Sequence, residues 1–269
     1  MKPKKTVYYA DERQDDFAGN HIQAKPVDEH FPYTNRRPLW HAVGAFLYRA
    51  VATPVAFAVC RGAFGMRVKN RRALRRLSNT GFFMYANHTQ ALHDAFSPSL
   101  LSFPKKCYII TSPDSVSLPF LRNVVLMLGA IPLPTTAGAV RKFKHTVEKR
   151  IRSGKPVMIY PEAHIWPYYT GVRDFSDESF IYPVRLSVPV VAVAVTYRER
   201  RFLKKLPPLT TLYISDPFYP DPACSPREAR TALRNQVYDF LRQHVCTPEN
   251  AEYIHYEKDP DLARDDRLA

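Results

Sequence analysis

A histidine and an aspartate lie close together directly after a predicted buried strand. The strand is expected over residues 82–86 and runs into Asn87 and His88, and Asp94 follows in the first turn of a predicted helix from about Ala91 to Ser102. Ligands of open α/β sheets bind at the carboxyl ends of strands. An imidazole with a pKa of about 6.5 can take a proton from a hydroxyl near neutral pH, and a carboxylate that orients it makes it a better base. The pair is therefore a candidate for general-base chemistry, although an isolated histidine is more often structural.

Two further predicted strands end in a similar way. The strand Val157–Tyr160 leads into Glu162, which places a second carboxylate at a strand end. The apolar run Ser187–Val195 has Pro189 near its start, where a missing N–H removes least of the ladder bonding. We expect the three strand ends to converge on one rim of the sheet.

Four short blocks follow one another in the order found in a known family. They are Asn87-His88 with Asp94, Gly129-Ala130-Ile131, Tyr160-Pro161-Glu162 and Val188-Pro189-Val190-Val191. Over roughly Arg67 to Tyr197 the sequence therefore resembles the glycerophospholipid acyltransferases, a family that includes enzymes of the 1-acylglycerol-3-phosphate type. The order and approximate spacing of all four blocks make this resemblance specific.

The resemblance implies an enzyme of phospholipid biosynthesis. It implies transfer of a fatty acyl group from acyl-CoA or acyl carrier protein to a hydroxyl of a lysophospholipid or a glycerol-phosphate-like acceptor. His88 would be the general base and Asp94 would orient it, while Asn87 and Glu162 are expected to bind substrate, Glu162 holding either the acceptor's polar head or the local loop. We expect no metal and no cofactor, because the acyl thioester is itself a substrate. The sequence has no Gly-x-Ser-x-Gly nucleophile motif, and direct attack on a bound thioester needs no stable acyl-enzyme.

The first block departs from the family pattern by one residue. Four residues separate the histidine from the aspartate in most of the family, whereas five separate His88 from Asp94 here, and His93 occupies the earlier position. Either Asp94 reaches His88 through a turn with one extra residue, or His93 takes part. A carboxylate suits the orienting role better, which favours Asp94.

Two arginines of the family pattern, which resemble phosphate ligands, are missing. Thr135 ends the second block, and Ala163 and Ile165 stand in the third block where the family has glycine and arginine. Arginine grips phosphate with two parallel hydrogen bonds, so nearby cations are candidates to replace the lost charge. These cations are Arg141, Lys142 and Lys144 in the next helix and Arg173 in the loop after the third block. The alternatives are that these cations form a solvated surface and that the acceptor is a glycolipid or an amine without phosphate.

The elements that must position these residues alternate between strands and helices. Apolar runs expected as strands lie at residues 82–86, 107–111, 131–133, 157–160, 188–196 and 210–215, and helices are expected at 91–102, at 139–152 and after the capping box Ser225-Pro226-Glu228. This alternation predicts an α/β fold with one main sheet flanked by helices, and the resemblance implies the single mixed sheet of the glycerol-3-phosphate acyltransferases. The aromatic loop Ile165–Ser179 is long for a compact domain, and we interpret it either as a lid or as packing over the sheet edge.

An apolar segment precedes this domain. Its longest run, Leu39–Cys60, is interrupted by Arg49 and Pro54, and no charge-free span reaches the ~18 to 20 residues of a bilayer crossing, which argues against a transmembrane helix. A helix lying in the headgroup region with Arg49 reaching outward fits the pattern, and a core-packing helix pair is the alternative. The expected divisions are a polar and loosely ordered N-terminal arm (1–38) that folds back over the body, a membrane-associating helical segment (39–66), the acyltransferase domain (67–246) and a charged tail (247–269).

The charge balance points to an anionic partner. The chain has 39 lysines and arginines against 25 acidic residues, a formal net charge of +14. The basic segment Arg61–Arg76 beside the apolar segment favours an anionic membrane surface, where each cation contributes about 1 kcal/mol, and a solvated helix face is the alternative. No nucleic-acid motif with interleaved aromatics is present, so nucleic acid is not an expected partner. A non-catalytic basic module that binds membranes or nucleic acid remains the alternative to an enzyme.

Cysteine usage and the N-terminal sequence bear on the compartment. The four cysteines lack the two-residue spacing of zinc or redox sites, so we expect buried thiols. Residues 1–37 are polar throughout and do not resemble a signal peptide. We therefore expect a peripheral or monotopic protein on the cytoplasmic face of a membrane.

Overall fold

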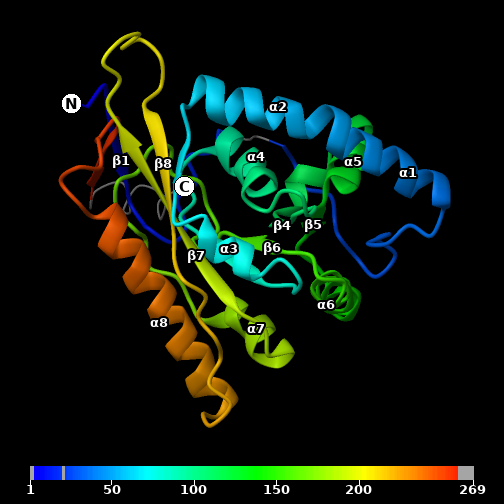
Figure 1. Ribbon diagram of the computed structural model, residues 1–269. Helices are drawn as coiled ribbons and strands as arrows, with labels where there is room; N and C mark the ends of the chain where they lie inside the picture. Colours follow the sequence, from blue (N-terminus) through cyan, green and yellow to red (C-terminus); the bar gives the residue numbers. More distant parts are fainter. Residues whose placement is uncertain (1–2, 20–21, 260–269) are drawn as a thin grey trace, which may run out of the picture.

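The fold is built around one large mixed sheet (Figure 1). The computed structural model describes residues 3–19 and 22–259, and within these residues the main sheet has seven strands. In spatial order they are β2 (Arg67–Lys69), β8 (Leu209–Ile214), β7 (Val190–Arg198), β3 (Phe83–Ala86), β6 (Val157–Ile159), β4 (Tyr108–Thr111) and β5 (Ala130–Pro132). The five strands from β7 to β5 are parallel, β8 is antiparallel to β7, and β2 is parallel to β8. The predicted mixed α/β sheet is confirmed.

Helices cover both faces of this sheet, because its central strands are apolar on both sides. Met84 and Ala86 of β3 point into one hydrophobic cluster, and Phe83 and Tyr85 point into the other. The first face carries α3 (Arg72–Arg76), α4 (Ala91–Leu101) and the N-terminal helix, while the second carries α6 (Ala137–Arg152), α7 (Ile181–Leu186) and α8 (Pro226–Val245). α5 (Pro119–Leu128) packs beside the N-terminal helix, and short 3-10 turns occur at Pro113–Val116 and Glu178–Phe180. α8 begins with the predicted capping box of Ser225 and Glu228.

The apolar segment forms one continuous helix, which runs across the top of Figure 1. It comprises α1 (Pro38–Phe46), a π-helical stretch Leu47–Ala52, α2 (Thr53–Phe57) and a second π-helical stretch Ala58–Ala63. Pro54 stands in the first turn of α2, directly after the first π-helical stretch, and does not break the helix. The span Pro38–Ala63 is long and apolar enough to cross a membrane by length and composition alone, and the interruptions expected at Arg49 and Pro54 do not divide the helix.

The N-terminal arm is more ordered than predicted. It folds back over the body as expected, but it contributes β1 (Thr6–Tyr9), which pairs in parallel with β9 (His255–Lys258) from the predicted tail. This second small sheet was not foreseen, because pairing between segments some 250 residues apart leaves no local pattern. The end of the predicted tail, residues 260–269, lies outside the described residues.

The aromatic loop after β6 packs as part of the body. Trp166 is fully buried, and its ring stacks on Tyr256 with centroids 5.0 Å apart and lies 4.6 Å from the ring of Tyr9. Of the two interpretations of this loop, packing over the sheet edge therefore agrees with the structure.

The four cysteines are all free thiols. Cys60 and Cys107 are buried as expected, whereas Cys224 and Cys246 are exposed, which corrects the prediction for half of the set. Cys224 lies in the turn before α8 and Cys246 directly follows that helix, so both lie at the exposed ends of the helix and not in the core.

Candidate active site

Asn87 fixes the end of β3 against its neighbour. Its side-chain nitrogen donates to the carbonyl of Val195 at 3.0 Å, and its side-chain oxygen accepts from the N–H of Val195 at 2.8 Å. The amide is fully buried and both of its ends are engaged by β7. These bonds hold the chain rigidly where His88 leaves the sheet. The predicted contact of Asn87 with substrate stays a prediction.

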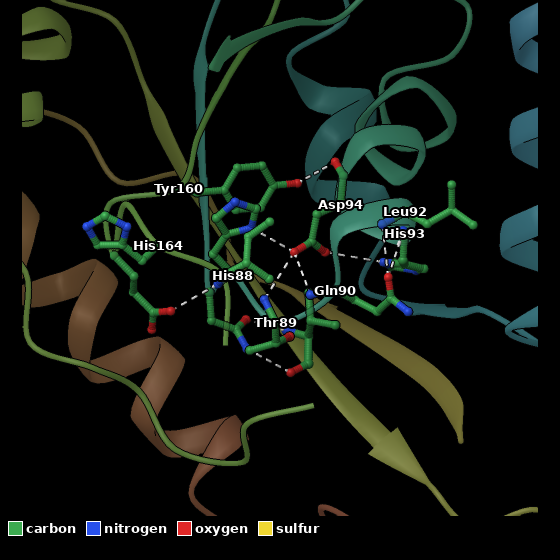
Figure 2. Close-up of polar contacts among 12 residues, drawn as sticks. His88, Thr89, Gln90, Leu92, His93, Asp94, Tyr160 and His164 are labelled. Carbon is green, nitrogen blue, oxygen red and sulfur yellow. Dashed lines mark hydrogen bonds and ion pairs between the residues drawn. The ribbon is translucent and has the colours of Figure 1, made fainter. Parts of the chain in front are cut away.

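Asp94 reaches His88 despite the longer spacing. One carboxylate oxygen, Oδ2, lies 2.9 Å from His88 Nδ1 and accepts the backbone N–H groups of Thr89 at 3.1 Å and Gln90 at 3.0 Å (Figure 2). The side chain of Gln90 caps α4 by accepting from the backbone N–H groups of Leu92 and His93. The extra residue is thus absorbed in the turn between strand and helix, and the helix then presents Asp94 to the imidazole.

His93 lies behind the carboxylate. Its Nδ1 is 3.5 Å from the other oxygen of Asp94, Oδ1, and its Nε2 is 3.4 Å from the hydroxyl of Thr210. The ring is fully buried and packs edge-on against Phe64. His93 therefore contacts Asp94 from the interior, on the opposite side from His88, as Figure 2 shows.

The electrostatics keep Asp94 ionised. Burial alone would raise the pKa of Asp94, but the hydrogen bonds and charges of His88 and His93 outweigh burial and hold the pKa below its usual value. An anionic carboxylate at Nδ1 makes that nitrogen the proton donor, so the lone pair of His88 lies on Nε2. Among the described residues Nε2 has no hydrogen-bond partner, and the His88 side chain is 16% exposed. The imidazole is therefore poised to accept a proton from a ligand.

Tyr160 supports the histidine from the adjacent strand end. Its ring stacks on that of His88 with centroids 4.2 Å apart and an interplanar angle of 18°, and its hydroxyl donates to the backbone carbonyl of Asp94 at 2.7 Å. Tyr160 and the capping residue Gln90 were both missed as site residues in the sequence. Tyr160 belongs to the third block and Gln90 is two residues from His88, but neither side chain's direction can be deduced from spacing.

Glu162 ties the third block to the backbone of the first. Its Oε2 accepts the N–H of His88 at 3.0 Å and the guanidinium of Arg173 at 3.3 Å, and its Oε1 accepts the N–H of Arg173 at 3.1 Å. Both side chains are almost fully buried, and Arg173 also bonds the carbonyl of His164 and lies 5.0 Å from the Trp166 ring. Burial raises the pKa of Glu162, and the Arg173 cation opposes that shift. Of its two predicted roles, Glu162 has contacts of the kind that hold the local loop.

One family model matches this sequence. Residues 65–196 match the model of the acyltransferase family. This range contains all four blocks and the His88 cluster, that is, His88, Asp94, Tyr160 and Glu162. The chain belongs to the acyltransferase family. The sequence-based resemblance is confirmed at the level of the acyltransferase family.

The fold of this acyltransferase is also that of a solved relative. The crystal structure of the 1-acyl-sn-glycerophosphate (LPA) acyltransferase PlsC from Thermotoga maritima superimposes with a TM-score of 0.54 at 18% identity, over 78% of this chain and 84% of that chain. Comparison of the sequence with curated proteins gave no match. The structural likeness supports the shared sheet and helix arrangement.

The N-terminal arm forms hydrogen bonds with Thr135 and Ile165, the two residues at the positions where the family pattern has arginine. Thr135 exchanges two hydrogen bonds with Val27, at 2.9 and 3.1 Å, and the carbonyl of Ile165 accepts the N–H of Phe17 at 3.1 Å. The candidate replacement cations lie elsewhere: Arg173 is paired with Glu162, Lys142 bonds the carbonyl of Glu29, and Arg141 and Lys144 are exposed on α6. Among the described residues no hydrogen bond or ion pair links Arg141 or Lys144 to His88, Asp94 or Glu162. Their binding of substrate stays a prediction.

A separate cavity of about 260 Å³ lies against the edge strand β5, between the arm, α1, α5 and α6. Its wall is mixed, with Trp40, Tyr33, Lys106 and Arg150, and it contains no residue of the His88 cluster. Within the described residues no group of three or more histidine, cysteine or acidic side chains is arranged to hold a metal ion. The hydrogen-bonded residues at the end of β3, His88 and Asp94 with Tyr160 and Glu162, stay the candidate active site.

Proposed function

We propose that this protein transfers a fatty acyl group from a thioester, acyl-CoA or acyl carrier protein, to a hydroxyl of a lysophospholipid or a similar lipid acceptor in phospholipid synthesis. The observation that carries the proposal is the 2.9 Å contact between His88 Nδ1 and a buried, ionised Asp94, which leaves Nε2 free at a partly exposed edge. That arrangement is what a general base for a hydroxyl requires.

The reaction needs no covalent enzyme intermediate. Nε2 of His88 takes the proton of the acceptor hydroxyl as the oxygen attacks the thioester carbonyl carbon, forming the new C–O bond. The C–S bond then breaks, and the departing thiolate takes the proton from Nε2. Asp94 stabilises the imidazolium between these steps, and Tyr160 and Glu162 hold the ring and the backbone of His88 in place.

A non-phosphate acceptor is the second candidate, and it is favoured by the contacts of the arm. Thr135 and Ile165 bond to the arm, and Arg173 is engaged by Glu162, so the cationic clamp of the family pattern has no equivalent at these positions. A glycolipid hydroxyl or an amine would not need such a clamp.

The membrane is the place where such acceptors occur, and the N-terminal helix suits a position flat on its surface. The helix is buried along one side at Gly44, Tyr48, Ala56 and Cys60, which are separated by four or eight residues, and that side packs on α4 and α5. Its other side exposes Leu39, Val43, Phe46, Val51, Val55 and Phe57. A helix held to the body along its length cannot cross a bilayer alone, so we propose that it lies in the headgroup region of an anionic leaflet, on the cytoplasmic face.

Thioester consumption tests the proposal. Purified protein is incubated with vesicles containing anionic lipid, acyl-CoA or acyl carrier protein donor, and a panel of lysophosphatidate, other lysophospholipids, glycolipids and amines, and free thiol is measured. We expect acceptor-dependent release that His88→Ala abolishes without loss of vesicle binding. His145→Ala, which removes an exposed imidazole on α6, is the matched control and should retain activity. Equal activity of the His88→Ala variant would refute the proposal, and turnover of lysophosphatidate alone would remove the second candidate.

A further inference from the structure

The hairpin that joins β7 to β8 carries an unusual tip. Phe202 and Leu203 at its end are 83% and 70% exposed, although hairpin tips in water are ordinarily polar. Four cations stand immediately beside these two apolar side chains, namely Arg200, Arg201, Lys204 and Lys205. Apolar side chains surrounded by lysine and arginine are the composition of segments that bind the surface of anionic membranes.

The tip is held next to the N-terminal helix. The guanidinium of Arg200 bonds the carbonyl of Ala63, the last residue of that helix, and Arg198 Nη2 donates to the carbonyl of Gly65 at 3.0 Å. At the start of β8, the backbone N–H of Thr210 donates a hydrogen bond to the carbonyl of Phe64 at 2.9 Å. Figure 1 shows the hairpin rising on the same side of the molecule as the long helix. The hairpin with the exposed apolar tip is thus held beside the C-terminal end of the helix.

We propose that residues 199–206 are a second membrane anchor, which inserts Phe202 and Leu203 among the headgroups of an anionic bilayer while the flanking cations contact lipid phosphates. This inference rests on the proposed membrane association of the protein. A helix alone leaves the domain free to rotate about the helix axis, whereas a second contact beyond the end of the helix fixes that rotation. The hairpin would therefore set the orientation of the His88 rim relative to the bilayer.

A bilayer fits the tip better than an acidic protein does. An acidic carrier protein would satisfy the cations, but it would have no reason to match the apolar side of the adjacent helix, which carries exposed Phe46, Val51, Val55 and Phe57. A membrane satisfies the helix, the apolar tip and the cations with one surface.

Depth-dependent fluorescence quenching tests the inference. In a Trp40→Phe background, Phe202→Trp places a probe at the tip, and Tyr219→Trp places a matched probe that starts from a 62% exposed aromatic. Tyr219 follows Phe218, which pairs with Val190, so the control lies at the opposite end of β7 from the hairpin. The remaining Trp166 is fully buried and serves as a constant background. The proteins are bound to vesicles of phosphatidylcholine and phosphatidylglycerol with brominated acyl chains.

We expect the Phe202→Trp probe to shift its emission to the blue and to be quenched severalfold more than the Tyr219→Trp probe. The double variant Phe202→Ser, Leu203→Ser should bind vesicles about tenfold or more weakly, as expected for loss of two apolar side chains from the interface, with unchanged turnover of a detergent-dispersed acceptor.

Equal quenching of the two probes on vesicle-bound protein would overturn the anchor while leaving membrane association intact. Loss of affinity for an acidic carrier protein in Lys204→Glu, Lys205→Glu, with unchanged vesicle binding, would overturn it in favour of a protein dock. Failure of the wild-type protein to bind vesicles would overturn the anchor and the proposed membrane association together.

Discussion

Replacing Asp94 with asparagine separates the charge of the carboxylate from its geometry. Oδ2 of Asp94 faces three donors, His88 Nδ1 and the N–H groups of Thr89 and Gln90, whereas Oδ1 faces only His93 Nδ1, at 3.5 Å. An asparagine must therefore place its oxygen at the Oδ2 position and its amide nitrogen toward His93, which can present an unprotonated Nδ1. His88 would keep the same tautomer and lose only the anion that stabilises its imidazolium.

The expected loss follows from the difference between charged and neutral hydrogen bonds. A bond to a charged group contributes about 1.5–3 kcal/mol against about 1 kcal/mol for a neutral pair, and the anion's attraction to the imidazolium adds to this difference. A net loss of roughly 1.4–2.8 kcal/mol corresponds to a decrease of about 10- to 100-fold in kcat. Asp94→Ala also frees the ring to turn and leaves two backbone N–H groups without their acceptor, so we expect it to lose about 1000-fold or more.

The assay is thiol release under saturating acceptor, with the unfolding transition of each variant measured in urea. An Asp94→Asn variant that is folded yet as inactive as His88→Ala would refute the reasoning about the tautomer. Unchanged activity would show that the charge of Asp94 is not used.

Further predictions concern stability. Ala163 adopts a left-handed conformation with φ of 65°, where the family pattern has glycine, so Ala163→Gly should raise the free energy of unfolding by up to about 1 kcal/mol, seen as a higher Tm. Glu162→Gln leaves Arg173 buried without its counter-charge and should lower the free energy of unfolding, measured in urea, by about 3–5 kcal/mol. Adding Arg173→Met to this variant should restore part of the lost stability. If the effects of the two substitutions simply add, the proposed pairing is contradicted. Burial, together with nearby cations, lowers the pKa of Lys106 to about 8. Because the unfolded chain binds that proton up to about pH 10.4, the Lys106 contribution to stability should rise between pH 8 and 10, and Lys106→Met should remove this rise. The folded state lowers the pKa of Asp94, so the contribution of Asp94 to the free energy of unfolding is complete above about pH 4 and is lost as the pH falls through the folded pKa. Asp94→Asn should not show this loss when its unfolding in urea is measured at decreasing pH.

Much of the fold could be predicted because its signals are local. Strands such as β3 and β7 are apolar on both faces and end at polar residues, and α8 begins with a capping box, so their types and approximate ends follow from neighbouring residues. The N-terminal helix continues through Pro54, with π-helical turns on either side of α2, and it packs against α4 and α5, distant contacts that leave no local pattern in the sequence. Pairing of β1 with β9 joins the two ends of the chain and has no short-range signature.

The amino-acid sequence by itself indicated the acyltransferase family and the residues that are candidates for its chemistry. His88 follows a predicted buried strand, and the carboxylates Asp94 and Glu162 also lie close to strand ends. Because the ends of parallel strands meet at one edge of a sheet, this pattern predicts that the three side chains lie near one another. The tertiary structure decided how those groups are used. It selected Asp94 over His93 as the partner of His88, and it paired Arg173 with Glu162. These choices depend on the direction of each side chain and on contacts between distant segments, which packing determines and sequence spacing does not.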